Sequence, residues 1–261
     1  MSRMPEDHIH RLAAHGFQAG AQTYVKGRPD YPSEVIAWLR DQLGLQNGRT
    51  VLDLGAGTGK FLPRLLATDA HVIAVEPVEA MRAALSSAFP QVEVRAGRAE
   101  AIPLESGSVD AVTCAQAFHW FATRPALAEI HRVLKSDGAL GLIWNVRDES
   151  VEWVRALTGI IQPFEGDAPR YQSLEWRAVF PAEGFSELKE FSVAHAHVGP
   201  PEQVIVDRTL SISFVAALPV LEQHRIADEI RALIARTPEL AGKSTVSFPY
   251  RTHAYCCRKI V

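Results

Sequence analysis

Three glycines and two acidic residues in the first third of the chain have the types and the spacing of a nucleoside-binding site. Gly55, Gly57 and Gly59 lie in the run VLDLGAGTGKF, where an apolar segment typical of a strand gives way to the start of a helix. Glycine allows the backbone to approach a ligand closely, and free N–H groups at a helix N-terminus can receive an anion. Asp53 lies inside the apolar segment, and Glu76 ends the next one, HVIAVE, where a carboxylate can accept both hydroxyls of a ribose. The pattern predicts a nucleoside site, although a tight turn followed by a solvated acid is the alternative.

The glycine spacing separates this loop from the loop of most dinucleotide-binding proteins. Their fingerprint is G-x-G-x-x-G/A, whereas this chain has G-x-G-x-G and carries Lys60 where the third dinucleotide glycine would stand. An NAD-dependent oxidoreductase is therefore the less favoured interpretation of the loop.

A second group of polar and aromatic residues follows a different apolar segment, SVDAVT. The run CAQAFHWFA, residues 114–122, places Gln116, His119 and Trp120 where that strand should end. In open α/β sheets, ligands bind outside the carboxyl ends of the strands, so we expect these side chains at the rim of a site. A histidine that titrates near neutrality suits a general base. Packing in the loop, or contact with a substrate, is the alternative for His119.

Strands and helices that would position these residues alternate from about 33 to 145. Continuous apolar strands separated by helices are typical of a parallel sheet covered on both faces. The expected strands are 50–55, 71–76, 92–97, 109–116 and 139–144, and the expected helices are 33–43, 60–67, 77–89 and 125–135.

The alternation changes after residue 145. Helical patterns occupy 150–164, 174–185, 202–217 and 220–236, and strand patterns occupy 187–198 and 245–261. Because no repeat or flexible linker interrupts the chain, we predict a single domain over 1–261. Its predicted parts are an N-terminal lid and first helix at 1–45, a binding core at 46–147, pocket-shaping insertions at 148–184 and 200–243, and a last strand at 244–261.

Composition and charge argue against several classes of protein. The 261 residues are 47% hydrophobic and 22% charged with a formal charge of -3, so no basic field is expected to hold nucleic acid. Residues 1–16 do not predict a signal peptide, and no apolar stretch is long enough for a bilayer. We expect a cytoplasmic protein with three reduced, structural cysteines. His195 and His197 have a metal-compatible spacing, but no further ligand can be placed beside them, so no metal is expected.

Five ordered motifs lie between about 50 and 145, namely VLDLGAGTG, VIAVEP with Met81, GRAEAIP, SVDAVTCAQAFHWF and the helix through EIHRVLKSDGAL. Together they resemble the class I S-adenosylmethionine-dependent methyltransferases, in particular the group that includes the ubiquinone-pathway and trans-aconitate enzymes. The resemblance implies a Rossmann-like α/β fold with a seven-stranded, mostly parallel sheet, helices on both faces and helical cap insertions. It also implies that the last strand is inserted antiparallel beside the fifth.

The resemblance further implies a cofactor, S-adenosylmethionine, which leaves as S-adenosylhomocysteine. In relatives the N-terminal segment, here YVKGRPDYP, folds across this cofactor. The implied cofactor-binding residues are Tyr24, Arg28, Asp53, Gly55, Ala56, Gly57, Gly59, Glu76, Pro77, Met81, Ala99, Glu100 and Gln116. The residues expected to meet the methyl acceptor are Tyr31, His119, Trp120, Asn145, Arg147, Ser211 and Phe214. Arg98 departs from the family, since many relatives carry there an acid that contacts the adenine amine.

We therefore expect methyl transfer from S-adenosylmethionine to a small-molecule acceptor by in-line displacement. The accepting atom is an oxygen, a nitrogen or a carbon, on a carboxylate-bearing molecule or a secondary metabolite. A cofactor-binding protein with different chemistry and an NAD-dependent oxidoreductase are the alternatives. The run CAQAFHWF lacks the N/D-P-P-Y/F motif of base methylation, which also argues against nucleic acid as the substrate. Neither a monomer nor a homodimer is favoured by the sequence.

Overall fold

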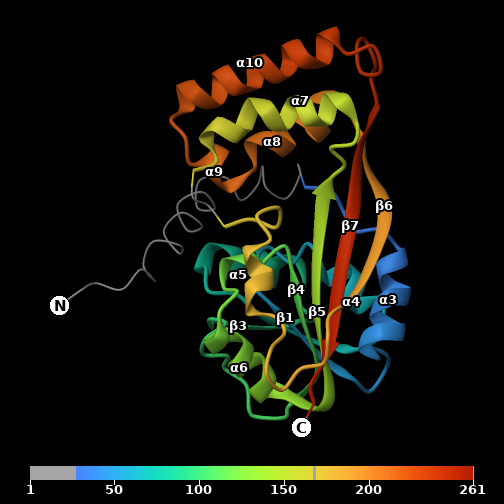
Figure 1. Cartoon of the computed structure of the whole chain (residues 1–261), viewed down its shortest axis with the longest axis vertical. Helices are drawn as coiled ribbons and strands as arrows, with labels where there is room; N and C mark the ends of the chain where they lie inside the picture. The colour runs from blue at the N-terminus through green and yellow to red at the C-terminus, as the bar shows by residue number, and fades with distance from the viewer. Residues whose placement is uncertain (1–27, 167–168, 261) are drawn as a thin grey trace, which may run out of the picture. The chain divides into compact units, whose positions relative to one another are not determined.

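The computed structural model describes residues 28–166 and 169–260. Its central feature is a seven-stranded sheet in the order β3-β2-β1-β4-β5-β7-β6 (Figure 1). Five strands carry the alternating part of the chain: β1 (Thr50–Leu54), β2 (His71–Val75), β3 (Glu93–Arg95), β4 (Val109–Ala115) and β5 (Leu134–Arg147). They pair in parallel, and β1 and β2 are in register from Thr50 beside His71 to Leu54 beside Val75. The order reverses between β1 and β4, the position at which open α/β sheets bind ligands.

The last strand runs against the other strands. Strand β7 (Val246–Arg258) lies between β5 and β6 (Lys189–Gly199). The Lys259 amide donates to the Gly138 carbonyl at 2.8 Å, whereas the Thr252 hydroxyl meets the Asn145 side chain at 2.6 Å. Positions in β7 therefore fall as positions in β5 rise, which makes the pair antiparallel. The expected Rossmann-like sheet, with its last strand inserted beside the fifth, is confirmed.

Helices cover both faces of the sheet. Helices α3 (Glu34–Leu43), α4 (Leu62–Leu66) and α5 (Glu79–Ala88) share one apolar cluster with one face of the strands. From β1 to β3 the chain moves across the sheet toward one edge. Helix α6 (Arg124–Val133) connects β4 to β5, and there the chain moves toward the other edge. Because crossovers between parallel strands are right-handed, that reversal places α6 on the other face. The Thr123 hydroxyl accepts a hydrogen bond from the Ala126 amide at 3.3 Å, as its predicted cap position requires.

The chain divides into two compact units, and the unit with residues 31–145, 169–193 and 252–261 holds the parallel strands and α3 to α6. Its segment 174–185 was expected to be helical. The structure has only a short 3-10 helix, η3 (Glu175–Val179), because Pro181 and Gly184 cannot continue a helix favourably.

The described residues of the other unit are 28–30, 146–166 and 194–251. Helix α7 (Glu152–Ile161), with the 3-10 turn η2 (Gln162–Phe164), packs on α10 (Val220–Arg236) in an apolar cluster of its own. The helix predicted at 202–217 is a π-helix, η4 (Glu202–Asp207), followed by α8 (Arg208–Leu210) and α9 (Ser213–Ala216). The break falls at Ile212, whose ψ of 132° is extended. Whether the two units act as the single predicted domain stays a prediction.

None of the helices in the described part of the chain combines the length and the apolar character needed to cross a bilayer.

Packing of α3 over β5 gives a testable constraint on the sheet. A Cβ atom at Gly141 would lie 2.7 Å from Leu43 Cδ2 and 3.1 Å from Trp38 Cη2. Gly141→Val is therefore expected to lower the free energy of unfolding by about 1–3 kcal/mol through overpacking. Denaturant unfolding measures the change. Gly159→Ala is the control, because that helical position has nothing within 4 Å and should gain up to about 1 kcal/mol. An unchanged midpoint for Gly141→Val would contradict the close approach.

Candidate functional site

The glycine loop is tied to the end of the neighbouring strand β2. The amides of Gly55 and Ala56 both donate to the Val75 carbonyl, at 2.8 and 3.2 Å. Gly55 has a φ of 72°, and a Cβ atom there would lie 2.9 Å from the Ala117 Cβ. Only glycine combines that left-handed backbone with so close an approach. The loop is thus held between β2 and the segment that follows β4.

Glu76 binds the middle of the same loop. Its Oε2 accepts from the Gly57 amide and its Oε1 from the Val78 amide, each at 2.9 Å. The side chain is buried, and desolvation raises its pKa, although the two amide bonds act in the opposite direction. A carboxylate has about four lone-pair positions, so both oxygens can still accept from a ligand hydroxyl. Glu76 therefore both shapes the loop and offers acceptors beside it.

Asp53 is a second buried carboxyl, inside β1. Its Oδ1 accepts from the Thr113 hydroxyl at 3.0 Å, but its Oδ2 has no hydrogen-bond partner among the described residues. Burial raises the pKa of Asp53 to about 7, with the Thr113 bond lowering it and Glu76 raising it further. A buried carboxylate oxygen without a donor is costly. It fits a ligand that brings a cationic or N–H group.

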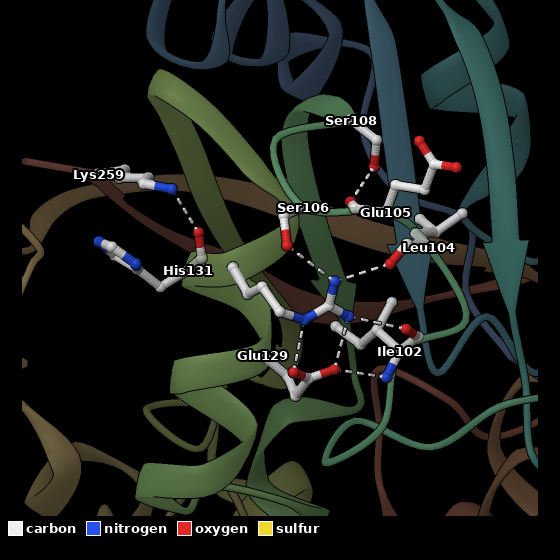
Figure 2. A network of polar contacts seen from close by, with 9 residues as sticks. Ile102, Leu104, Glu105, Ser106, Ser108, Glu129, His131 and Lys259 are labelled. Carbon is white, nitrogen blue, oxygen red and sulfur yellow. Dashed lines mark hydrogen bonds and ion pairs between the residues drawn. The ribbon is translucent and has the colours of Figure 1, made fainter.

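A loop after β3 is held in place by an ion pair on α6 (Figure 2). The Arg132 guanidinium binds the two Glu129 oxygens at 2.7 and 2.8 Å and also donates to the Ile102 and Leu104 carbonyls. Glu129 accepts from the Ile102 amide at 2.9 Å, and hydrogen bonding to Arg132 holds the pKa of Glu129 below its usual range. The fixed loop includes the buried residue Ala99.

The segment after β4 begins with backbone strain. Gln116 has a φ of 57°, which is uncommon for any residue with a side chain. Its side-chain Nε2 donates to the Asn145 carbonyl at 3.0 Å, which ties the end of β4 to the end of β5. The 3-10 turn η1 (Phe118–Trp120) follows directly. Strain of this kind is concentrated at functional sites.

His119, in that turn, is oriented by a buried tryptophan. The indole Nε1–H of Trp144 lies 3.1 Å from His119 Nδ1. An indole nitrogen can only donate, so Nδ1 accepts and the proton of neutral His119 is on Nε2. Trp144 is itself fixed by the rings of Trp176 and Tyr171, with centroids 4.7 and 5.1 Å away. The arrangement presents His119 as a donor through Nε2.

Comparisons with known proteins identify the family of this chain. A family model described as a methyltransferase domain matches residues 52–142. The uncharacterized methyltransferase-like protein C25B8.10 of Schizosaccharomyces pombe is 37% identical over 93% of this chain and 95% of its own. The uncharacterized methyltransferase Rv3342 of Mycobacterium tuberculosis is 39% identical over 90% and 92%. This chain belongs to the class I methyltransferases.

Solved structures share the fold of the methyltransferase. The YcgJ protein from Bacillus subtilis is 22% identical, with a TM-score of 0.56 over 88% of this chain and all of its own. The [4+2]-cyclase SpnF is 17% identical, with a TM-score of 0.54 over 95% of each chain. At such identities the likeness concerns the fold alone.

Most of the expected cofactor residues of the methyltransferase come together in one unit. The carboxyls of Asp53 and Glu76 flank the glycine loop, and Met81 is buried with its Sδ 3.9 Å from where a Gly57 Cβ would be. Ala56 lies in the loop, Pro77 is exposed directly after Glu76, and Glu100 is exposed beside Ala99. Gly59, with a φ of 85°, ends the loop against the Phe89 ring.

The remaining expected residues are more dispersed. Tyr24 lies outside the described residues. Tyr31 is buried in the apolar cluster, with its ring centroid 4.8 Å from that of Phe61. Asn145 is buried and accepts from Thr252 through Oδ1, whereas Trp120 is half-buried beside His119.

In the second unit, the Arg28 Nη2 donates to the Ser211 carbonyl at 3.2 Å. Arg147 and Ser211 are buried there, and Phe214 is partly buried. The expected contact of Arg28 with the cofactor and the expected contacts of the other three residues with the acceptor stay predictions.

Two partners in the site were not identified from the sequence. Thr113 bonds Asp53 across neighbouring strands, and Trp144 bonds His119 from 25 positions further along the chain. Both lie in continuous apolar strands, where the sequence predicts only that a threonine or a tryptophan is part of the core. Within the described ranges, no group of three or more histidine, cysteine or acidic side chains is placed to hold a metal ion.

Burial of Asp53 makes the stability of the methyltransferase depend on pH. The pKa of Asp53 is about 7 in the folded chain and 3.8 as an unperturbed group. Between these values the folded state binds more protons, so stability falls as pH rises toward 7. Asp53→Asn removes this cost and should raise the free energy of unfolding above pH 7 by about 2–4 kcal/mol. The stability gained by Asp53→Asn should decrease as the pH falls toward 4.

Urea unfolding at several pH values measures the effect. The exposed Asp41→Asn is the control, and it should leave the pH profile unchanged. A destabilised Asp53→Asn protein at pH 8 would mean that the ionised carboxylate has a partner.

The Trp144 bond predicts one tautomer for His119. Nitrogen-15 NMR of the imidazole should show a protonated Nε2 and a hydrogen-bonded, unprotonated Nδ1. Trp144→Phe removes the donor and should shift the Nδ1 resonance, whereas Trp153→Phe, in the other apolar cluster, should not. A populated Nδ1–H form in the unmodified protein would contradict the assigned orientation.

Proposed function

We propose that the protein transfers the methyl group of S-adenosylmethionine to a small-molecule acceptor. The observation that carries the proposal is the pair of buried carboxyls at the glycine loop, one of which has an oxygen without a donor. A sulfonium nucleoside brings the groups that this pair can bind, namely two ribose hydroxyls and a cationic amine.

Each part of the cofactor has a matching group in the unit that holds the parallel strands. Glu76 would accept the ribose hydroxyls through the lone pairs that the loop amides leave open. Asp53 would accept the ammonium of the methionine end through Oδ2. Met81 and the buried Ala99 would contact the adenine, with the Ala99 loop held by Arg132 and Glu129. Gly57 has a φ of 57°, a left-handed backbone conformation that glycine adopts without strain.

Methyl transfer asks the protein mainly for alignment and exclusion of water. When bound, S-adenosylmethionine supplies an electrophilic methyl group on a positively charged sulfur. The strained Gln116, fixed to the end of β5 through its amide, would orient the methionine end. His119 would meet the acceptor from the turn that follows.

The fixed tautomer of His119 bears on whether it acts as a base. With its proton on Nε2, His119 donates a hydrogen bond to an oxygen or nitrogen of the acceptor. Removal of a proton from the acceptor through Nε2 would require the other tautomer and the loss of the Trp144 bond. Substrate orientation is therefore the role we propose for His119.

The alternatives are less well supported. An NAD-dependent oxidoreductase is disfavoured by the G-x-G-x-G spacing and by the methyltransferase relatives over nearly the whole chain. Different chemistry on a bound cofactor is the closer rival, because a fold does not determine a reaction and a [4+2]-cyclase shares this one. Detection of a methylated product in an acceptor screen decides between the two.

Calorimetric titration with S-adenosylmethionine, S-adenosylhomocysteine and NAD tests the cofactor. Both sulfur nucleosides should bind and NAD should not. Glu76→Gln should weaken binding by about 10- to 100-fold, because the new amide nitrogen faces a backbone N–H and leaves it unpaired. Glu79→Gln, an exposed acid in the first turn of α5, is the control and should bind normally. Binding of NAD alone would overturn the proposal.

A further inference from the structure

One arginine in the second unit is buried without a partner among the residues that the structure describes. Arg208 is only 7% exposed, and its Nε and Nη1 are shielded from solvent with no hydrogen-bond acceptor among the described residues. A charged group in such a position is expensive unless it is paired. Arginines are rarely buried in this way.

The neighbouring acid does not neutralise Arg208. Asp207 precedes it, but the pKa of Asp207 is raised by burial and by Glu202, and the one cation that lowers it is Arg231. Arg231 forms an ion pair with Glu202 and a second one with Asp228 at 2.9 Å. Within the described ranges, the acids of this segment are therefore engaged elsewhere.

The backbone around Arg208 is irregular and fixed. The π-helix Glu202–Asp207 comes directly before it, and π-helical turns occur frequently at functional sites. The Ser211 hydroxyl donates to the Arg208 carbonyl at 2.7 Å, and the Arg28 guanidinium donates to the Ser211 carbonyl. Ser211 thus fixes the Arg208 turn, and the Arg28 guanidinium is used in a bond to the Ser211 backbone.

The chain on both sides of this turn is apolar. Val204, Ile205 and Val206 precede Arg208, and Ile212 and Val215 follow it, all buried in one cluster. The segment therefore combines apolar side chains with one unpaired positive charge. A single guanidinium matches a carboxylate in charge and in planar geometry, whereas a phosphate dianion usually needs more than one cation.

We propose that Arg208 binds the carboxylate of a small organic acid. Binding of this anion does not depend on the proposed methyl transfer. A bound carboxylate would supply the acceptors that the Arg208 nitrogens lack. In the free protein, the same buried charge lowers stability.

Thermal unfolding of the full chain at constant ionic strength tests the proposal. The probes are acetate, benzoate, succinate and citrate, compared with sulfate and inorganic phosphate. The carboxylates should raise the melting temperature of the unmodified protein. Arg208→Met should melt higher than the unmodified protein without any probe and should bind carboxylates about 10- to 100-fold more weakly.

Two further variants keep the test decisive. Arg225→Met, an exposed position on α10, should respond to carboxylates like the unmodified protein. Arg208→Lys, which keeps the charge but loses the planar fork, should bind them more weakly even if Arg208→Met does not fold.

Several results would overturn the proposal. It fails if Arg208→Met melts lower and still responds to carboxylates, since Arg208 would then be structural. It also fails if no carboxylate stabilises the unmodified protein, or if only sulfate and phosphate do. Calorimetry with S-adenosylmethionine separates the two proposals, because Arg208→Met should bind that cofactor normally. Failure of the unmodified protein to bind S-adenosylmethionine would instead count against methyl transfer.

Discussion

The site depends on a carboxylate that bonds backbone amides from two elements. Glu76 ends β2, yet its two oxygens accept from the glycine loop after β1 and from the start of α5. An acid so deeply buried is stable only because N–H groups surround it. The same bonds fix the loop conformation, so the shape of the loop and the charge beside it cannot vary independently. A substitution at position 76 would therefore change the shape of the loop and the charge beside it together.

Features of the fold that follow from local pattern could be predicted from the sequence. Alternating apolar strands and helices, the glycine loop and the acid at the end of β2 each depend on neighbouring residues, and the structure has them where they were expected. The 3-10 turn at Glu175–Val179 shows the limit of that reasoning, because a helical pattern next to Pro181 and Gly184 did not become a full helix.

Contacts between distant residues could not be predicted in this way. Trp144 reads as one more apolar residue of a buried strand, and nothing near it in the sequence points to His119. Arg208 reads as the solvated residue of an amphipathic helix, and only its position in the folded chain shows that its charge is buried. In both cases the chemistry depends on a polar atom whose surroundings are set by segments far away in the sequence. A pattern within one segment carries no information about such atoms.

The antiparallel insertion of β7 has a consequence for how the chain acquires its structure. Strand β6 is made before β7, but it lies beside β7 and not beside β5. While the ribosome is still producing residues 246–258, β5 and β6 each have an edge without its final neighbour, and unpaired edges attract other strands. The parallel strands before β5 can assemble first, as their connections are short. Completion of the sheet therefore waits until β7 has been made, and nascent chains are most exposed to aggregation before that point.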